Sequence, residues 1–293
     1  MTKNALDRAC EDGRRLEFRP GHCLSLARPL VMGVLNVTPD SFSDGGRFAT
    51  TEQAVEHALR LEEDGADIID IGGESTRPGA EPVDEDKEKE RVLPVIRRLR
   101  DLSDIPISID TYKSGVAEAA LAAGADMVND VSACSFDTHM FAVLAATGAP
   151  VVLMHMQGSP REMQVNPHYE DCVAEIKVYL QKRIERCLVM GIDRSKIIVD
   201  PGIGFGKRLE DNLQILRRFN EFLELRVPVM IAASRKSFIG KLHNPDSPPD
   251  ERIGGSLAAA IAGANAGASI IRAHDVAQTV EAMHVTQAIM NSR

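Results

Sequence analysis

The sequence predicts an α/β protein built as a (β/α)8 TIM barrel with a short N-terminal β-hairpin. Short runs of Ile, Val, Leu and Met recur along the chain, with longer amphipathic segments between them. One junction occurs four times, as Gly, Ala, a polar residue or Pro, and two apolar residues, starting at Gly65, Gly124, Gly148 and Gly267. Eight strand–helix units in roughly 260 residues suit such a barrel. A doubly wound open sheet would use the same junctions and is the alternative.

The expected elements follow one another in a regular order. Residues 1–15 are polar and are expected to form a flexible N-terminus, followed by a single domain over residues 16–293. Residues 16–26 alternate loosely around Pro20 and Gly21, which predicts the hairpin. Strands are expected at residues 30–35, 68–71, 105–109, 127–128, 151–154, 197–199, 227–231 and 270–271.

Helices are expected between these strands, and two of them have a clear apolar stripe. The first stripe consists of Val173, Ile176, Leu180, Ile184 and Cys187. The second consists of Leu213, Leu216, Phe219 and Leu223, with Asp211 or Asn212 as the N-cap. The charged run at residues 81–91 is interpreted as a solvated helix face. The four repeated glycines are expected to end helices in the left-handed conformation.

Composition and charge exclude several classes of protein. The net charge of −9 and the absence of a basic tail argue against nucleic-acid binding through phosphate neutralisation. Five cysteines without a Cys-x-x-Cys pair favour reduced thiols over a disulfide scaffold or a zinc site. Residues 1–8 hold no apolar signal core, and no apolar run is long enough to span a bilayer. We therefore expect a cytoplasmic protein that binds neither membranes nor nucleic acids.

Polar residues follow almost every expected strand. They are Asn36, residues 72–77, Asp110, Asn129, Asp130, His155, Asp200, residues 234–236, Arg272 and His274. In a barrel these positions converge on one face, where ligands bind. Burying so many polar groups costs about 1–3 kcal/mol for each one left unsatisfied, so pairing with each other or with a ligand is expected.

These residues divide by chemistry. Asp110, Asn129 and Asp200 offer acceptors and an amide, which suit a flat heterocycle with several N–H groups. Positive charge suited to an oxyanion or a diphosphate comes from Arg77, Lys236, Arg272 and His274. Asn36 and Asp44 are oxygen ligands that could share Mg²⁺ with that diphosphate.

Seven motifs, in order and each at a strand end, resemble those of the dihydropteroate synthases of the pterin-binding barrel superfamily. The resemblance covers residues 29–283. The motifs are GVLNVTPDSFSDGG (33–46), DIGGESTRPG (70–79), SIDT (108–111), VNDV (128–131), DPGIGFGK (200–207), SRKSFIG (234–240) and RAHDV (272–276).

The resemblance implies a reaction and a set of partners. Such enzymes condense 6-hydroxymethyl-7,8-dihydropterin diphosphate with p-aminobenzoate, giving 7,8-dihydropteroate and diphosphate for folate synthesis. It implies Mg²⁺ as cofactor, a homodimer, and inhibition by sulfonamides, which mimic p-aminobenzoate.

The resemblance also implies roles for individual residues. The pterin site would consist of Asp110, Asn129, Met154, Asp200, Phe205 and Lys236. The diphosphate and Mg²⁺ would be held by Asn36, Asp44, Arg272 and His274. The aminobenzoate site would be formed by Phe42, Thr76, Arg77, Pro78 and Ser237. Asp110, Lys236, Asp44 and Arg77 are the expected catalytic residues.

Three other functions are weighed against this one. A methyltetrahydrofolate:corrinoid methyltransferase would share the pterin-binding Asp and Asn residues but would need neither the SFSDGG loop nor a diphosphate site, and both are present. A class I aldolase-type barrel would use Lys236 as a Schiff base. A non-catalytic pterin-binding paralogue would be favoured by damaged loops, whereas both loops are complete.

Overall fold

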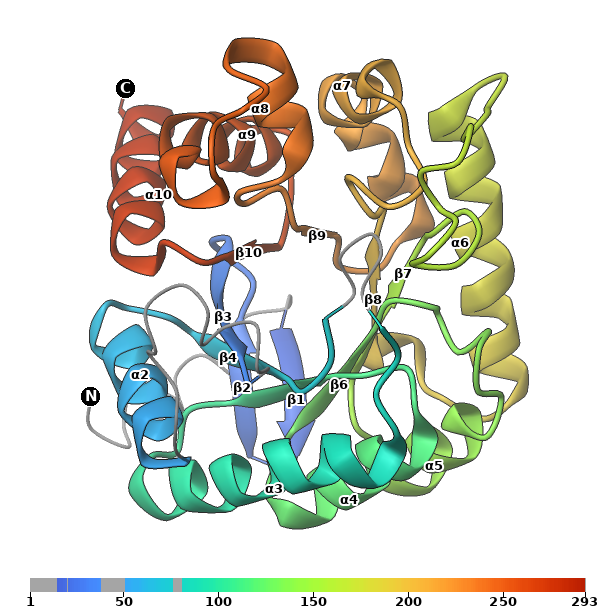
Figure 1. The fold of residues 1–293 in the computed structure, drawn as a ribbon, viewed down its shortest axis with the longest axis vertical. Coiled ribbons are helices and arrows are strands. Elements are labelled where there is room, and N and C mark those ends of the chain that lie inside the picture. Colours follow the sequence, from blue (N-terminus) through green and yellow to red (C-terminus); the bar gives the residue numbers. More distant parts are fainter. Residues whose placement is uncertain (1–14, 20, 38–50, 76–80, 293) are drawn as a thin grey trace.

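The computed structural model describes residues 15–19, 21–37, 51–75 and 81–292, in which eight parallel strands form a nearly closed barrel (Figure 1). Its strands are β3 (Leu30–Asn36), β4 (Ile68–Gly72), β5 (Ile107–Asp110), β6 (Met127–Asp130), β7 (Val151–Met154), β8 (Ile197–Asp200), β9 (Met230–Ile231) and β10 (Ile270–Ala273). Strands β3 to β8 pair in chain order, and β10 pairs with both β3 and β9. A parallel bridge between Val199 and Val229 completes the ring. This circular order confirms the barrel and excludes the doubly wound sheet.

Helices surround the barrel (Figure 1). They are α2 (Thr51–Glu63), α3 (Glu85–Leu102), α4 (Ser114–Ala123), α5 (Met140–Thr147), α6 (Cys172–Val189), α7 (Leu209–Arg217), α8 (Ser237–His243), α9 (Ile253–Asn265) and α10 (Val276–Asn291). Short 3₁₀ helices cover Arg194–Lys196, Phe219–Leu225 and Pro249–Glu251. The repeated glycines end or follow the helices with φ of 96°, 116°, 66° and 99° at Gly65, Gly124, Gly148 and Gly267, as predicted.

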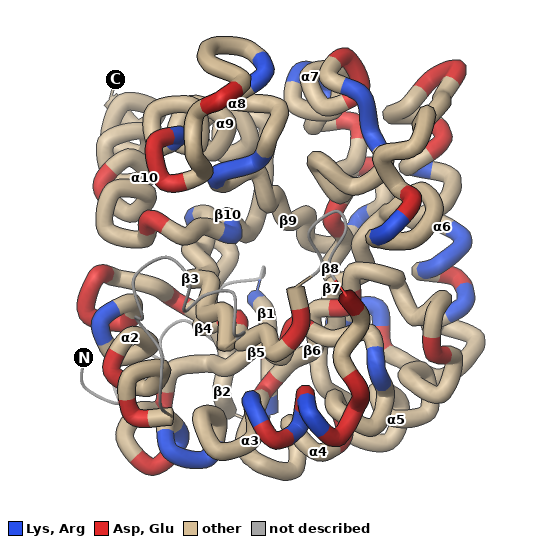
Figure 2. The backbone as a smooth tube through the Cα atoms, viewed as in Figure 1, with Lys and Arg blue, Asp and Glu red and all other residues tan. Residues whose placement is uncertain are grey.

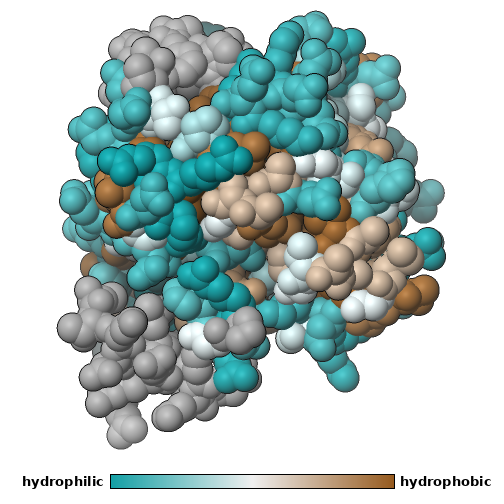
Figure 3. All heavy atoms as spheres, turned by 90° about the horizontal axis from the view of Figure 1, so that it is seen from below, coloured by the Kyte–Doolittle hydropathy of each residue, from teal (hydrophilic) through white to brown (hydrophobic). Residues whose placement is uncertain are grey.

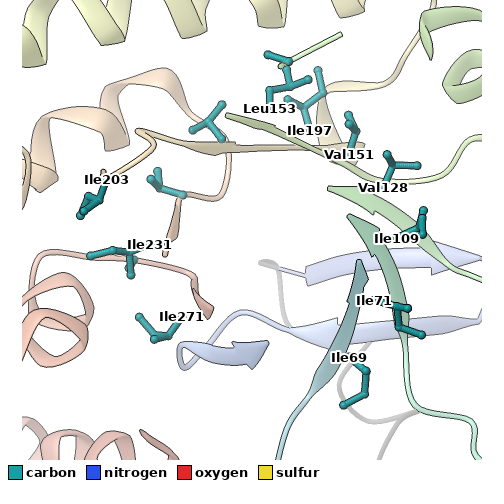
Figure 4. Close-up of a cluster of buried hydrophobic side chains, with 14 of the residues drawn as sticks. Ile69, Ile71, Ile109, Val128, Val151, Leu153, Ile197, Ile203, Ile231 and Ile271 are labelled. Carbon is teal, nitrogen blue, oxygen red and sulfur yellow. The ribbon is translucent and has the colours of Figure 1, made fainter. Parts of the chain in front are cut away.

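Successive residues of each strand point to opposite sides of the barrel wall. One set packs against the helices and includes Ile69, Ile109, Val128, Val151, Ile197 and Ile271 (Figure 4). The alternate set fills the interior and includes Met32, Ile68, Met127, Val152, Ile198, Met230 and Ile270. Both sets are buried, so the strands are apolar runs without a solvent-facing side.

The predicted hairpin closes one end of the barrel. It consists of β1 (Arg15–Arg19) and β2 (His22–Ser25), paired antiparallel. Leu16 and Phe18 pack on the interior set of strand residues. Lys196 Nζ donates to the backbone oxygen of Glu17 at 2.6 Å. The hairpin therefore covers the end of the barrel where the strands begin, and leaves the other end for ligands.

Two expectations about helices have opposite outcomes. The stripe from Val173 to Cys187 is fully buried in α6, as predicted. The prediction of a buried stripe from Leu213 to Leu223 is wrong, because Leu213 and Leu223 are 38% and 39% exposed. The α-helix ends at Arg217 and continues as a 3₁₀ helix, which has about three residues per turn and changes the buried face.

The expectation of reduced thiols holds only in part. Cys134, Cys172 and Cys187 are free and buried. Cys23 is disulfide-bonded, so the expectation is wrong at that position.

The outer surface is hydrophilic with interrupted apolar patches, as Figure 3 shows for the face seen from below. Acidic and basic residues are interspersed along α3 and α6 (Figure 2). Across the described ranges, no helix is both long and apolar enough to cross a membrane.

Arg100 on α3 fixes the neighbouring strand ends. It donates to Asp126 at 2.5 Å and to backbone oxygens of Ser103, Ile105 and Gly124. We predict that Arg100→Leu lowers the free energy of unfolding by about 3 kcal/mol, because the buried Asp126 then keeps only the guanidinium group of Arg19, 3.9 Å away, as a charged partner. Urea denaturation measures this loss.

Lys89→Leu on the same helix is the matched control. Lys89 forms a more exposed pair with Glu85, so its loss should cost about 0–1 kcal/mol. Equal losses in the two variants would contradict the role of Arg100.

Candidate active site

Polar side chains replace the apolar interior layer at the carboxyl ends of the strands. Asp70, Asn129, Asp200 and Arg272 each stand two residues after an interior residue, namely Ile68, Met127, Ile198 and Ile270. Asp110 follows the outward Ile109 and therefore also points inward. The alternation of the strands thus directs these five side chains into one region.

Arg272 lies between two carboxylates at the centre of this region. Its Nε is 2.6 Å from Asp70 Oδ2, and its Nη2 is 2.8 Å from Asp110 Oδ2. Asn129 Nδ2 donates to the same Asp70 oxygen at 3.0 Å. Burial opposes the guanidinium charge, but Asp70 and Asp110 together raise the pKa of Arg272. Arg272 is therefore a fixed cation at the strand ends.

Asp110 is a carboxyl group that titrates near neutral pH. Burial raises its pKa to about 7, and the charges of Asp70 and Glu88 act in the same direction. The positive charges of Arg272 and Lys236 oppose that rise. A ligand that brings positive charge or N–H donors to Asp110 would stabilise its ionised form.

Two buried carboxylate oxygens in this region lack a hydrogen-bond partner among the described residues. They are Asp70 Oδ1 and Asp200 Oδ2. The other oxygen of Asp200 accepts from the backbone N–H of Gly202 at 2.7 Å. Burial raises the pKa of Asp200, although Gly202, Lys236 and Lys207 favour its charge. Unpaired buried acceptors are rare and indicate where ligand donors can bind.

Gly72 lies between Asn36, a predicted ligand of the diphosphate and Mg²⁺, and Asp110, a predicted ligand of the pterin. Asn36, Gly72 and Asp110 are direct neighbours across β3, β4 and β5. A Cβ at Gly72 would lie 3.7 Å from both Asn36 Oδ1 and Asp110 Oδ2. Oxygen atoms from two strands therefore face a position without a side chain.

An apolar wall stands beside the carboxylates. Met154 and Phe205 belong to one buried cluster with Val131, Met156 and Met163. Lys236 Nζ lies 4.0 Å from the centroid of the Phe205 ring. Such a wall suits a flat ring, and the Lys236 ammonium group over the Phe205 face adds a cation beside it.

The remaining predicted residues divide into described and undescribed positions. His274 Nδ1 lies 3.1 Å from Ser234 Oγ, two residues beyond Arg272. Ser237 is exposed at the first turn of α8, directly after Lys236. Phe42, Asp44, Thr76, Arg77 and Pro78 lie outside the described residues.

Sequence reasoning missed Asp70 and a nearby charged group. Asp70 stands inside an apolar run, and a charge in such a run signals a buried partner. Glu88 lies in the charged run interpreted as solvated, yet it is fully buried and pairs with Lys113, which also pairs with Glu74. That interpretation is wrong at Glu88, because this residue lies on the buried face of α3.

Fold and site together define a class of protein: a (β/α)8 barrel enzyme with its ligand site at the carboxyl ends of the strands. The family model described as "Pterin binding enzyme" matches residues 32–274. The dihydropteroate synthase of Escherichia coli (strain K12) is 46% identical over 276 residues, which cover 94% of this chain and 97% of that protein.

Solved structures agree with the sequence comparison. Xanthomonas albilineans dihydropteroate synthase with 4-aminobenzoic acid superposes with a TM-score of 0.90 at 48% identity, covering 96% of this chain and all of that one. The same enzyme with 7,8-dihydropteroate gives a TM-score of 0.86 at 46% identity, covering 95% of this chain and 100% of that one. The Yersinia pestis enzyme in complex with a sulfonamide drug gives a TM-score of 0.91 at 46% identity, covering 95% of this chain and 100% of that one. The chain belongs to the pterin-binding enzymes and, within that family, to the dihydropteroate synthases.

The raised pKa of Asp110 predicts how stability depends on pH. The folded state binds the Asp110 proton more tightly than the unfolded state, so this residue's contribution to stability is lost as pH rises from about 4 to about 7, at up to about 1.4 kcal/mol per pH unit. Asn does not titrate, so the Asp110→Asn variant has no such loss. Its free energy of unfolding should therefore rise relative to that of the original protein as pH increases over this range. Urea denaturation at pH 5 and pH 8 tests this, and parallel pH dependences of the two proteins would contradict it.

Proposed function

We propose that the inward polar layer is the site where this dihydropteroate synthase joins p-aminobenzoate to 6-hydroxymethyl-7,8-dihydropterin diphosphate. The observation that carries the assignment is Arg272, held by Asp70 and Asp110 near Asp200, one oxygen of which has no hydrogen-bond partner among the described residues. A pterin diphosphate requires acceptors for its ring N–H groups and a cation for its diphosphate, and this layer offers both. The enzyme is a transferase of folate biosynthesis, like the relatives it matches.

The pterin edge would bind Asp110, Asn129 and Asp200. The unpartnered Asp200 oxygen would accept from a ring N–H, which removes the cost of leaving it unsatisfied. Phe205 and Met154 would contact the ring face. Lys236, whose ammonium group lies over the face of the Phe205 ring, would donate to the pterin carbonyl and ring nitrogen.

The chemical step breaks the bond between the exocyclic carbon and the diphosphate oxygen, and the electron pair leaves with diphosphate. The positive charge that develops spreads into the dihydropterin, where the fixed carboxylate of Asp110 stabilises it. Arg272 stabilises the departing anion. The amine of p-aminobenzoate then forms the new C–N bond and loses a proton, without a covalent enzyme intermediate.

The donors at the strand ends suit the Mg²⁺ that the resemblance implies. The described residues contain no group of three His, Cys, Asp or Glu that could hold a metal ion by themselves. Mg²⁺ usually binds through one or two protein oxygens together with substrate phosphates, and the Asn36 amide oxygen lies beside Gly72, which has no side chain. Asn36 and Asp44 would hold the ion, which when bound would neutralise diphosphate charge.

The aminobenzoate part of the proposal rests on residues 42 and 76–78 together with Ser237. Sulfonamides would compete there, because the Yersinia pestis relative binds a sulfonamide drug. A cytoplasmic location stays a prediction from the sequence.

A homodimer would bury the apolar surface of α9 and α10. A groove of about 480 Å³ between these helices is lined by Leu257, Ile261, Val285, Ile289 and Met290, among others. Val285 is 54% exposed, and Ile289 and Met290 are each 66% exposed. Such contiguous apolar surface is typical of an interface, and α9 carries small residues that allow close packing.

We predict that Asp110→Asn folds but loses turnover by about 10²–10³-fold, because a charge that stabilises the transition state is gone. The assay measures diphosphate release from dihydropterin diphosphate in Mg²⁺, with and without p-aminobenzoate. Release that depends on p-aminobenzoate and yields dihydropteroate supports the function. Asp101→Asn, an exposed carboxylate, is the control. Normal turnover of Asp110→Asn would refute its charge role.

We also predict that Val285→Glu converts the dimer to a monomer. Light scattering at about 10 μM, well above the Kd of a stable dimer, should give twice the chain mass of 31.9 kDa for the original protein. Val178→Glu on α6 is the matched control, because Val178 is 53% exposed. A monomeric original protein, or a dimer that both variants retain, would overturn the proposal.

A further inference from the structure

A buried lysine follows the glycine-rich segment between β8 and α7. Lys207 is only 2% exposed. Its Nζ donates to the Phe205 backbone oxygen at 2.9 Å and to the His155 backbone oxygen at 3.3 Å, and it lies 3.0 Å from His155 Nδ1. All three donors of the ammonium group are therefore directed at uncharged acceptors. Burying a charge with only uncharged acceptors costs stability, so we expect Lys207 to have a functional role.

His155 serves as a fixed acceptor in this arrangement. Burial, together with the Lys207 charge, lowers the pKa of His155 to about 2, so the ring stays neutral. Nδ1 then accepts from Lys207, and the ring packs edge-on against Tyr179 with 4.9 Å between centroids. The His155 backbone N–H donates to the Asp200 backbone oxygen at 3.0 Å. One residue therefore connects Lys207 to the strand end that carries Asp200.

The segment that Lys207 holds forms part of the pterin site. Gly202 and Gly206 lie so close to the next segment that a Cβ would be 2.0 Å from the His155 oxygen and 2.5 Å from the Gln157 oxygen. Both glycines have positive φ, at 70° and 62°. Between them Phe205 directs its ring to Lys236, while its carbonyl accepts from Lys207.

Lys207 also acts on Asp200 through its charge. The titratable groups that face Lys207 are His155 after β7, Cys172 on α6, Asp200 on β8, Asp211 on α7, and Lys236. Burial lowers the pKa of Lys207 to about 7, against the attraction of Asp200 and Asp211. Lys207 and Lys236 both favour the charged form of Asp200.

We propose that Lys207 is a positioning residue of the pterin site: its ammonium group fixes the backbone of Phe205 and that of His155, whose N–H donates to the Asp200 backbone. This inference rests on the proposed binding of the pterin by Phe205 and Asp200. Lys207 itself contacts no substrate. Its removal should weaken pterin binding more than p-aminobenzoate binding, because Phe205 and Asp200 belong to the proposed pterin site.

The test compares Lys207→Met with Lys196→Met. Lys196 also donates to a backbone oxygen, but at the hairpin end of the barrel. For Lys207→Met we expect the KM for dihydropterin diphosphate to rise about tenfold, the equivalent of one lost hydrogen bond to a charged group, and the KM for p-aminobenzoate to stay within about twofold. Lys196→Met should leave both values unchanged. A Lys207→Met protein with reduced stability but a normal pterin KM would overturn the proposal.

A second measurement needs no variant that might fail to fold. In the original protein labelled with ¹³C at lysine Cε, one lysine should titrate near pH 7. Dihydropterin diphosphate should raise that midpoint by roughly half a pH unit, because bound anionic charge favours the ammonium form. A midpoint unchanged by the ligand would overturn the role of Lys207. Absent turnover in the original protein would instead refute the function itself.

Discussion

The ion cluster of Arg272 with Asp70 and Asp110 is the constraint on which the site depends. Three charges from β10, β4 and β5 meet where the apolar interior ends. Charges in such a place are costly unless they pair, and these pairs have distances of 2.6 and 2.8 Å. The cluster joins strands that are far apart in sequence. It leaves a cation at the ligand region, together with acceptors that have no partner in the described part of the chain.

The barrel supplies what this cluster needs. The hairpin closes one end, so the interior set of strand residues stays dry and the polar layer forms only at the other end. On the far side of the ring, the segment from Asp200 to Lys207 is held against the exit of β7 by glycine contacts and by Lys207. Asp200 therefore lies near two lysine charges and Asp110 near Arg272, which is how a buried site retains several carboxylates.

Much of the fold could be predicted because apolar strand runs, glycine junctions and polar strand ends are local features of the sequence. All eight strands were expected near their observed positions, although β9 begins at Met230 because Pro228 lacks an N–H for the ladder. Asp70, Glu88 and Lys207 were not assigned, because their roles depend on partners 25 to 202 residues away or on burial. The prediction of one buried stripe from Leu213 to Leu223 failed, because the spacing of apolar residues does not show that α7 is followed by a 3₁₀ helix.

If the ion cluster governs ligand binding, Asp70 should act through Arg272. Isothermal titration calorimetry with dihydropterin diphosphate should compare the original protein, Asp70→Asn, Arg272→Gln and the double variant, with circular dichroism to check folding. We expect Asp70→Asn to weaken binding in the original protein but to add little once Arg272 is replaced, with a coupling of at least about 1 kcal/mol. Strictly additive losses would contradict the central role of the cluster.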